Sequence, residues 1–342
     1  MPETITALTL GQLAQRYRDG ALDPVGVTEA YLDAIAAHPD GAKVYRVVTA
    51  ERALRQARAA QRLFERGVDL GPLQGVPLAI KDLVDTAGEV SASGSKVLAE
   101  RPPAAQDAPV AARLDAAGTV FLGRTNMTEL AYSGLGLNPH YGTPGAAPDR
   151  ERVPGGSSSG SGVAVASGLA AVAVGSDTGG SVRIPAAVNG VVGLKTTDGR
   201  IPTEGCVPLS TTLDTLGPMA RTVDDAWEVI DEISADGDVL ALALCDHRMP
   251  GTTGVEFLVD MMDDDRTAAT RKVLVTGQAQ LEDTIVAVNE ADLDHYIAKP
   301  WDRADLEATV RDQLTSYVAD MGIDPLPHLA ALDQARAMDL IR

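Results

Sequence analysis

One segment, residues 154–186, restricts the fold of this chain more than any other. Two glycine- and serine-rich turns flank a run of small apolar residues there. The first turn contains Ser157, and the second contains Ser181, 24 residues later. Glycine allows positive φ angles and close backbone approach, so N–H groups can converge beside a serine hydroxyl and form an oxyanion hole. The segment therefore predicts a buried core that carries a nucleophilic serine.

The second turn offers both the nucleophile and the donors of such a site. We expect the Ser181 hydroxyl in the attacking position. A glycine- and serine-rich loop alone is more typical of a linker or a phosphate-binding loop. Two such turns around an apolar run are harder to explain by composition. The backbone N–H groups expected in the oxyanion hole are those of Thr178, Gly179, Gly180 and Ser181.

These residues resemble the amidase signature family of serine hydrolases, which pairs two serines with an upstream lysine. A matching upstream segment, GVPLAIKD, covers residues 75–82 and contains Lys81. The chain has only six lysines, so a lysine that ends an apolar strand is unusual. Without the serines, a strand-end lysine that reaches to water would be the simpler interpretation. The positions that match the signature are Gly155, Gly156, Ser157, Ser158, Ser159, Gly160, Asp177, Gly179, Ser181, Val182, Arg183 and Pro185.

The resemblance implies that a carboxamide C–N bond is hydrolysed to a carboxylate and ammonia or an amine. Ser181 would attack the carbonyl, Ser157 would relay its proton, and Lys81 would accept it. A lysine can be that base if burial lowers its pKa from about 10.4. By the same resemblance, the reaction would pass through an acyl-enzyme and would need no cofactor.

Further residues have supporting roles by the same resemblance. In family members a cis peptide bond precedes the serine that corresponds to Ser157, and neighbouring glycines ease such a turn. We expect Asp177 and Arg183 to form a structural ion pair that supports the second turn. The supporting residues are Gly155, Gly156, Ser158, Asp177 and Arg183.

Helix and strand patterns alternate along the chain. This predicts an α/β fold with a mainly parallel or mixed sheet flanked by helices. The amidase resemblance ends near residue 233, so residues 1–233 are expected to form an amidase-like domain that is incomplete at its C-terminal side. Helices are expected over 10–20 (with Thr9 as N-cap), 24–38, 51–67, 108–118 and 126–134, and strands over 76–80 and 119–125.

Residues 234–320 contain Asp246 in a D-x-x-M-P-G motif, followed by Thr276 and then by Lys299. This segment resembles the C-terminal two-thirds of a response-regulator receiver domain, a flavodoxin-like α/β unit. In that resemblance the three residues match the phosphoacceptor, the switch hydroxyl and the phosphate-contacting lysine. Individually, each residue is an ordinary strand-end or capping residue. Residues 321–342 are expected to form a C-terminal tail helix.

Receiver domains also bind Mg²⁺ through an acidic pair, about 44 residues before the phosphoacceptor. The corresponding positions here are Ile201 and Pro202, and the nearby Asp224–Asp225 pair opens a helix instead. A hard divalent cation needs clustered oxygen ligands, which makes Mg²⁺ at the receiver-like segment doubtful.

The two incomplete segments meet near residue 234. Both resemble open α/β sheets, and an unpaired sheet edge is a liability. We therefore expect residues 239–245 to pair as a strand with the exposed edge of the amidase-like sheet.

The charge and cysteine content exclude several classes of partner. A net charge of −19 argues against nucleic acid and anionic membranes, which are polyanions themselves. Cys206 and Cys245 form no C-x-x-C motif. Residues 1–20 do not have the pattern of a signal peptide, and the sequence contains no run of 18 apolar residues. We expect a cytoplasmic protein with a small-molecule amide as substrate, and leave a homodimer or a signalling partner open.

Three functional hypotheses follow. The first is an amidase that uses Lys81, Ser157 and Ser181. The second is a signalling protein that is phosphorylated at Asp246, with the amidase-like part as a scaffold. The third is an inactive fusion of the two segments. The sequence leaves the acyl and amine specificity open.

Overall fold

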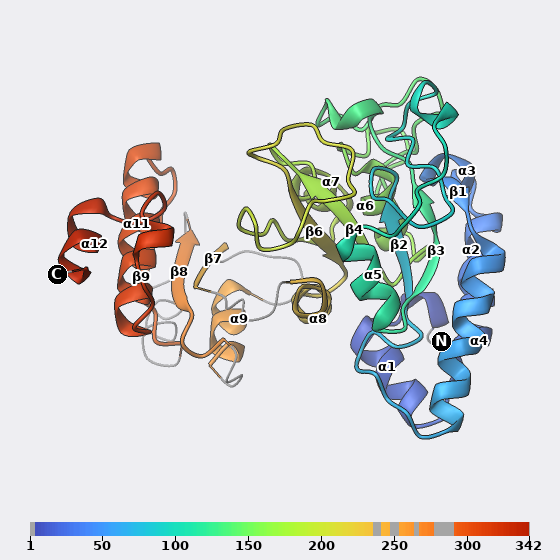
Figure 1. The fold of residues 1–342 in the computed structure, drawn as a ribbon, viewed down its shortest axis with the longest axis horizontal. Coiled ribbons are helices and arrows are strands. Elements are labelled where there is room, and N and C mark those ends of the chain that lie inside the picture. Colours follow the sequence, from blue (N-terminus) through green and yellow to red (C-terminus); the bar gives the residue numbers. More distant parts are fainter. Residues whose placement is uncertain (1–3, 235–240, 247–252, 263–266, 277–290, 342) are drawn as a thin grey trace. The chain divides into compact units, whose positions relative to one another are not determined.

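The computed structural model describes residues 4–234, 241–246, 253–262, 267–276 and 291–341 (Figure 1). The chain divides into two compact units, Met1–Asp236 and Gly237–Arg342, called unit 1 and unit 2 below. The predicted division into an amidase-like domain (1–233), a partial receiver segment (234–320) and a tail (321–342) stays a prediction.

Unit 1 is built on a six-stranded mixed sheet with the strand order β1-β3-β2-β4-β6-β5. The central strand β2 is parallel to both β3 and β4, whereas β6 is antiparallel to β4. Every residue of β2, β3 and β4 is buried. The predicted α/β class with a mixed, helix-flanked sheet is confirmed. The strands are β1 Tyr45–Val48, β2 Pro77–Lys81, β3 Val120–Thr125, β4 Val172–Asp177, β5 Val192–Gly193 and β6 Thr215–Ala220.

The sheet topology gathers polar residues at one edge. Because β2 and β4 are parallel, their last residues, Lys81 and Asp177, lie at the same end of the sheet. The antiparallel strand β6 starts at that end, where Thr215 is the register partner of Asp177. In open α/β sheets the carboxyl ends of the strands are where ligands bind.

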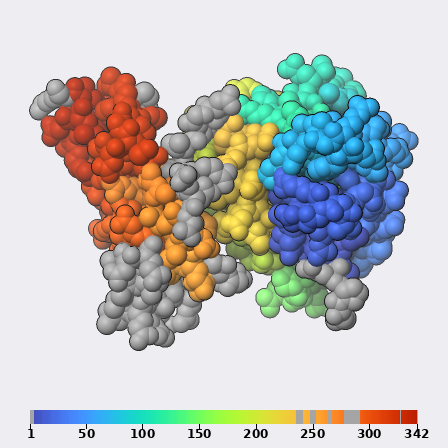
Figure 2. Space-filling model, turned by 90° about the horizontal axis from the view of Figure 1, so that it is seen from below, coloured from blue at the N-terminus to red at the C-terminus, as the bar shows by residue number. Residues whose placement is uncertain are grey.

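The predicted N-terminal helices are present. Thr9 caps α1 in a reciprocal capping box with Gln12. Helices α2 and α4 pack on each other and on β3, and α8 packs on α1 and β6. Figure 2 shows the N-terminal helices (blue) beside the segment that contains α8 (yellow). The helices are α1 Leu10–Arg18, α2 Pro24–Ala37, α3 Gly41–Val44, α4 Ala50–Glu65, α5 Pro109–Ala116, α6 Ser159–Ala166, α7 Arg183–Asn189 and α8 Val223–Ile233, with 3₁₀ turns η1 Ile5–Ala7 and η2 Leu98–Glu100.

Small residues allow α6 to lie deep in unit 1. A Cβ atom at Gly160 would lie 2.3 Å from the Val44 carbonyl oxygen and 2.6 Å from that of Asn126. Only glycine permits this approach, because real Cβ atoms do not come so close to backbone. The first serine-rich turn, which leads into α6, is therefore held against the core.

The helix predicted over residues 126–134 was wrong. The structure has only the 3₁₀ turn η3 (Glu129–Ala131), in which Leu130 and Ala131 have φ angles of 54° and 59°. Tertiary hydrogen bonds replace the helical ones: Thr128 N–H donates to the Ser157 carbonyl at 3.0 Å, and Leu130 N–H donates to the Ser93 carbonyl at 2.9 Å. These contacts tie the segment to the serine-rich turn.

Unit 2 contains a parallel three-stranded sheet with the order β7-β8-β9. Strand β7 pairs with β8 in this sheet, and the expected pairing of residues 239–245 with the amidase-like sheet stays a prediction, with residues 239 and 240 outside the described residues. Part of the predicted tail helix is present as α12. The elements are β7 Leu242–Asp246, α9 Gly254–Asp260, β8 Arg271–Thr276, β9 His295–Ala298, α11 Arg303–Asp320, η4 Leu326–His328 and α12 Gln334–Leu340.

Within the described parts of the chain, no helix combines the length and apolar character needed to cross a bilayer.

Candidate active site

Lys81 is the centre of the polar cluster in unit 1. It ends β2, and its side chain is fully buried. Its Nζ atom donates hydrogen bonds to Ser157 Oγ and to Ser176 Oγ, each at 2.8 Å. The structure thus brings the predicted lysine and the first predicted serine into direct contact. Ser176 has no role in the sequence-based prediction.

Burial lowers the pKa of Lys81 from 10.5 to about 7. Asp177, Asp214 and Cys206 act in the opposite direction, and for the two carboxylates the reason is that negative charge favours the protonated amine. A pKa near 7 leaves much of the amine neutral at neutral pH, which is the form that can accept a proton.

The turn that holds Ser157 is built from glycine. The Gly156–Ser157 peptide bond is cis, as the resemblance implied, and Gly155 has a φ of 71°. A Cβ atom at Gly156 would lie 2.5 Å from the Gly136 nitrogen, so this position also needs glycine. Ser157 itself is fully buried.

Asp177 organises the turn that holds Ser181. Its carboxylate accepts N–H bonds from Gly180 at 2.7 Å and from Val182 at 3.1 Å. The predicted ion pair with Arg183 is present at 3.0 Å. Burial alone would raise the pKa of Asp177, but these bonds, led by Arg183, hold it at about 2.

The geometry modifies the predicted oxyanion hole. Since the Gly180 N–H donates to Asp177, it already has an acceptor in this structure. Among the described residues, no acceptor is bonded to the N–H groups of Gly179 and Ser181. A Cβ atom at Gly179 would meet nothing within 4 Å, so there is open space beside it.

The two serine turns are joined by their backbones. Ser158 N–H donates to the Ser181 carbonyl at 3.2 Å. The Ser158 hydroxyl also donates to the Ser176 carbonyl at 3.3 Å. Ser181 is almost completely buried, with 8% of its surface exposed. Ser158, which the sequence predicted as a supporting residue, therefore links β4 to both turns.

A cavity of about 160 Å³ lies beside this cluster. Ser176, which accepts a bond from Lys81, lines it together with Asp214 and Thr215. Both polar and apolar side chains line the cavity. Its other walls are Leu83, Ala131, Asp198, Thr203, Cys206, Val207, Pro208, Leu209, Ser210, Thr211 and Leu216.

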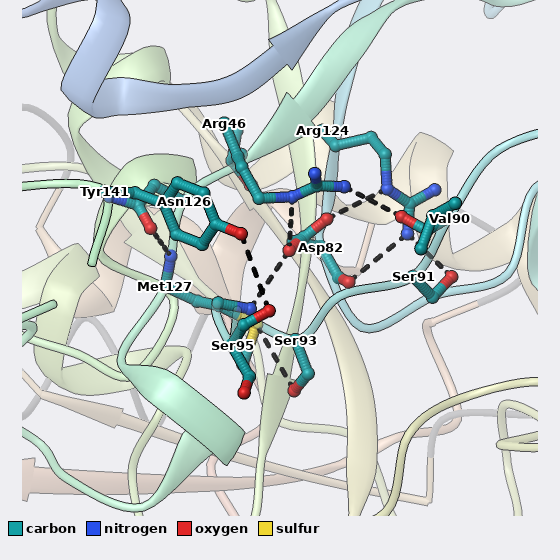
Figure 3. A network of polar contacts seen from close by, with 12 residues as sticks. Arg46, Asp82, Val90, Ser91, Ser93, Ser95, Arg124, Asn126, Met127 and Tyr141 are labelled. Atoms are coloured by element: carbon teal, nitrogen blue, oxygen red, sulfur yellow. Dashed lines mark hydrogen bonds and ion pairs between the residues drawn. The ribbon is translucent and has the colours of Figure 1, made fainter. Parts of the chain in front are cut away.

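Asp82, the next residue in the sequence after Lys81, is the centre of a buried ionic network (Figure 3). Arg124, which is 1% exposed, pairs with Asp82 at 3.0 Å, and Arg46 pairs with the other oxygen of Asp82 at 2.6 Å. Arg124 also donates to the Val84 carbonyl at 2.7 Å and to Ser91 Oγ at 2.8 Å. The network fixes the loop that starts directly after the lysine.

The residues that the sequence-based prediction missed have only weak sequence signals. Ser176 directly precedes Asp177, but no local pattern predicts its contact with Lys81. Asp214 belongs to a TLDT segment within the amidase-like region, and no local pattern predicts the hydrogen bond that it accepts from Thr178. Arg124 has the pattern of an ordinary strand-end arginine. Their partners come from distant segments, which local patterns do not report.

In unit 2, the three receiver-like residues lie at the carboxyl ends of the parallel strands. Asp246 ends β7, Thr276 ends β8, and Lys299 follows β9. Lys299 forms an ion pair with Asp246. Residues 247–251 of the D-x-x-M-P-G motif lie outside the described residues.

The acidic residues described here do not fit a divalent cation. Asp225 is buried in α8, where it accepts an N–H bond from Gly11 at 3.2 Å. In the part of the chain that the structure describes, no cluster of three or more His, Cys, Asp or Glu side chains could hold a metal.

Comparison with known proteins agrees with this geometry. Residues 26–242 match the Amidase family, so the chain belongs to that family. Residues 208–311 match the response regulator receiver domain.

Two curated relatives illustrate the match. The chain is 44% identical over 246 residues to one subunit of the glutamyl-tRNA(Gln) amidotransferase of Streptomyces avermitilis, a match that covers 72% of this chain and 49% of that protein. It is 43% identical over 221 residues to the 2-amino-5-chloromuconic acid deaminase of Comamonas testosteroni, over 64% of this chain and 47% of the relative. The chain thus spans about half the length of these relatives.

Solved structures share the fold. The peptide amidase of Stenotrophomonas maltophilia matches with a TM-score of 0.69 and 28% identity, over 97% of this chain and 75% of that one. Fatty acid amide hydrolase matches with a TM-score of 0.65 and 21% identity, over 95% and 68% of the two chains, which is a likeness of fold alone.

Proposed function

We propose that this protein hydrolyses a carboxamide through an acyl-enzyme on Ser181, with Ser157 as the proton relay and Lys81 as the base. The observation that carries the proposal is the buried Lys81 Nζ at 2.8 Å from Ser157 Oγ, beside the turn that holds Ser181. Membership in the Amidase family supports the reaction class.

In the first half-reaction, Ser181 Oγ forms a bond to the carbonyl carbon. The Ser181 proton passes to Ser157 Oγ, while the Ser157 proton passes to the neutral Lys81 amine. The N–H groups of Gly179 and Ser181 stabilise the negative charge on the substrate oxygen, since the Gly180 N–H already donates to Asp177. The C–N bond then breaks, and a proton returns along the same route to the leaving nitrogen.

In the second half-reaction, water adds to the acyl carbon and gives its proton to the same relay. The ester bond to Ser181 breaks, and the relay returns its proton to the Ser181 oxygen. The carboxylic acid leaves and gives its proton to solvent as it becomes the carboxylate. Nothing in this scheme requires a cofactor, since the base, the relay and the nucleophile all belong to this chain.

The substrate and the assembly are also proposals. A small-molecule amide suits the cavity of about 160 Å³ beside Lys81 and Ser176. One relative is named as a subunit of an amidotransferase, which favours a protein partner for this chain as well.

The test is release of ammonia or amine from a panel of simple carboxamides. We expect turnover by the wild type and losses of at least about 10³-fold in Ser181→Ala, Ser157→Ala and Lys81→Ala. Matched controls are Ser167→Ala and Lys96→Ala, which remove a serine and a lysine away from the cluster. Equal turnover in Ser181→Ala and the wild type would contradict the proposal.

A second candidate function rests on the Asp246–Lys299 ion pair in unit 2. We propose phosphoryl acceptance at Asp246 as the alternative, supported by the match to the receiver domain. The described residues do not offer the clustered oxygen ligands that Mg²⁺ needs. Acetyl phosphate should then raise the intact mass of the wild type but not of Asp246→Asn, and an unchanged wild-type mass would contradict this alternative.

A further inference from the structure

Asp214 joins two segments that meet at the candidate site. One carboxylate oxygen accepts a hydrogen bond from the Thr178 hydroxyl. The other accepts backbone N–H bonds from Leu209 at 2.8 Å and from Ser210 at 2.9 Å. Both carboxylate oxygens of Asp214 therefore accept hydrogen bonds. Thr178 lies 36 residues away in the sequence, whereas Leu209 and Ser210 lie within five residues.

Each partner of Asp214 borders the proposed reaction. Thr178 opens the turn that continues through Gly179 to Ser181, whereas Leu209 and Ser210 form part of the cavity wall. Asp214 thus fixes the cavity wall relative to the turn that carries the nucleophile. A charged acceptor makes such hydrogen bonds stronger than a neutral one would.

A second contact strengthens the same junction. Thr215 Oγ1 donates to the Asp177 carbonyl at 2.8 Å, and Thr215 is the register partner of Asp177 in the β4–β6 pair. Successive residues, Asp214 and Thr215, therefore bind the successive residues Thr178 and Asp177. The start of β6 acts as a clamp on the end of β4.

Asp214 also acts on Lys81 through its charge. The groups that influence the Lys81 amine are Asp177 from β4, Asp214 before β6, and Cys206 from the loop between β5 and β6. All three oppose the effect of burial. Removal of the Asp214 charge should therefore make Lys81 easier to deprotonate.

We infer that Asp214 is a positioning residue for the proposed amide hydrolysis, which holds Thr178 and the cavity wall in place and sets the electrostatic environment of Lys81. The inference rests on the proposed function. Asp214 touches neither the nucleophile nor the relay in the interactions described, so it acts through Thr178 and through its field.

Two variants separate the two roles. Asp214→Asn removes the charge and keeps a similar shape, whereas Thr178→Val removes the hydroxyl and keeps the charge. We expect kcat to fall by about 10- to 100-fold in both, because small displacements of a reacting group are costly. The acidic limb of the kcat/KM profile should move to lower pH in Asp214→Asn and stay in place in Thr178→Val.

A substrate-independent readout accompanies the kinetics. The Lys81 titration is followed by NMR of ¹³C-labelled lysine side chains, and assigned by its disappearance in Lys81→Ala. We expect a lower midpoint in Asp214→Asn and an unchanged midpoint in Thr178→Val. Asp33→Asn, which removes an exposed carboxylate on α2, is the charge-matched control and should leave both readouts unchanged.

The outcomes are distinct. An unshifted Lys81 titration in Asp214→Asn, or a wild-type kcat in Thr178→Val, overturns the inference. If Asp214→Asn does not fold, Thr178→Val decides by its kcat. A wild type that neither hydrolyses amides nor reacts at Ser181 with a fluorophosphonate probe overturns the proposed function. A positioning role for Asp214 in that reaction then falls with it. The Lys81 titration would still report the effect of the Asp214 charge, so the two failures are distinguishable.

Discussion

Lys81 is the residue on which the chemistry depends. Full burial favours the neutral amine, whereas Asp177, Asp214 and Cys206 favour the charged one, and the balance places its pKa at about 7. Lysine is a useful base only under such conditions, because an ordinary lysine is protonated at neutral pH. The two serine oxygens at 2.8 Å then give the amine a defined orientation.

The pH dependence of hydrolysis follows from this residue. The reactive form is deprotonated, so kcat/KM should rise about tenfold per pH unit below pH 7 and level off above it. Lys81→Arg should be inactive across the whole range, because a guanidinium does not lose its proton. A profile that falls as pH rises through 7 would contradict the assignment of Lys81 as the base.

At the scale of elements, the serine-rich turn depends on the close approach of α6 to its neighbours. Gly160 lies against the backbone of Val44 and Asn126, where a Cβ atom has no room. This close packing of α6 places Ser157 and Ser158 in the core, beside the carboxyl ends of β2 and β4.

Gly160→Ala should therefore destabilise the protein by about 1–3 kcal/mol, because backbone must move to admit the methyl group. Gly11→Ala is the matched control, since a Cβ atom there meets nothing within 4 Å and α1 gains from alanine. We expect it to be neutral or stabilising by up to about 1 kcal/mol. Urea denaturation compares the two, and equal stabilities would contradict the packing described for α6.

Local patterns were sufficient for many elements of unit 1. Thr9 and the amphipathic spacing of α1 predicted that helix, and the apolar run before Lys81 predicted β2. They failed over residues 126–134, where Thr128 and Leu130 donate to distant carbonyls instead of building a helix. Long-range hydrogen bonds override helix propensity, and a single sequence does not report them.

The same limit applies to the candidate site. Lys81, Ser157 and Ser181 were predicted through a long motif, and the first two are in contact. Ser176 and Asp214 were not predicted, because they meet their partners only when β2, β4 and β6 align. Sequence spacing contains no information on that alignment.

At the scale of the whole molecule, the proposed chemistry belongs to one unit. Lys81, Ser157 and Ser181 all lie in unit 1, whereas Asp246 lies in unit 2. The β7-β8-β9 sheet of unit 2 is separate from the six-stranded sheet. Within that sheet β7 pairs with β8, so the expected pairing of residues 239–245 with an edge of the larger sheet stays a prediction.

Asp246→Asn should accordingly leave amide hydrolysis within about twofold of the wild type, since the base, the relay and the nucleophile of the proposed reaction all belong to unit 1. Steady-state turnover of the best amide in the panel is the measurement, with Ser181→Ala as the inactive reference. A loss of more than about tenfold in Asp246→Asn would show that unit 2 takes part in the reaction.

The most direct test of an assembled Lys81–Ser157–Ser181 site is intact-mass analysis after treatment with a fluorophosphonate probe. We predict stoichiometric labelling of the wild type and no labelling of folded Ser181→Ala or Lys81→Ala, because the probe needs an activated serine. Absence of labelling in folded wild-type protein, or equal labelling of all three proteins, would contradict the proposed mechanism.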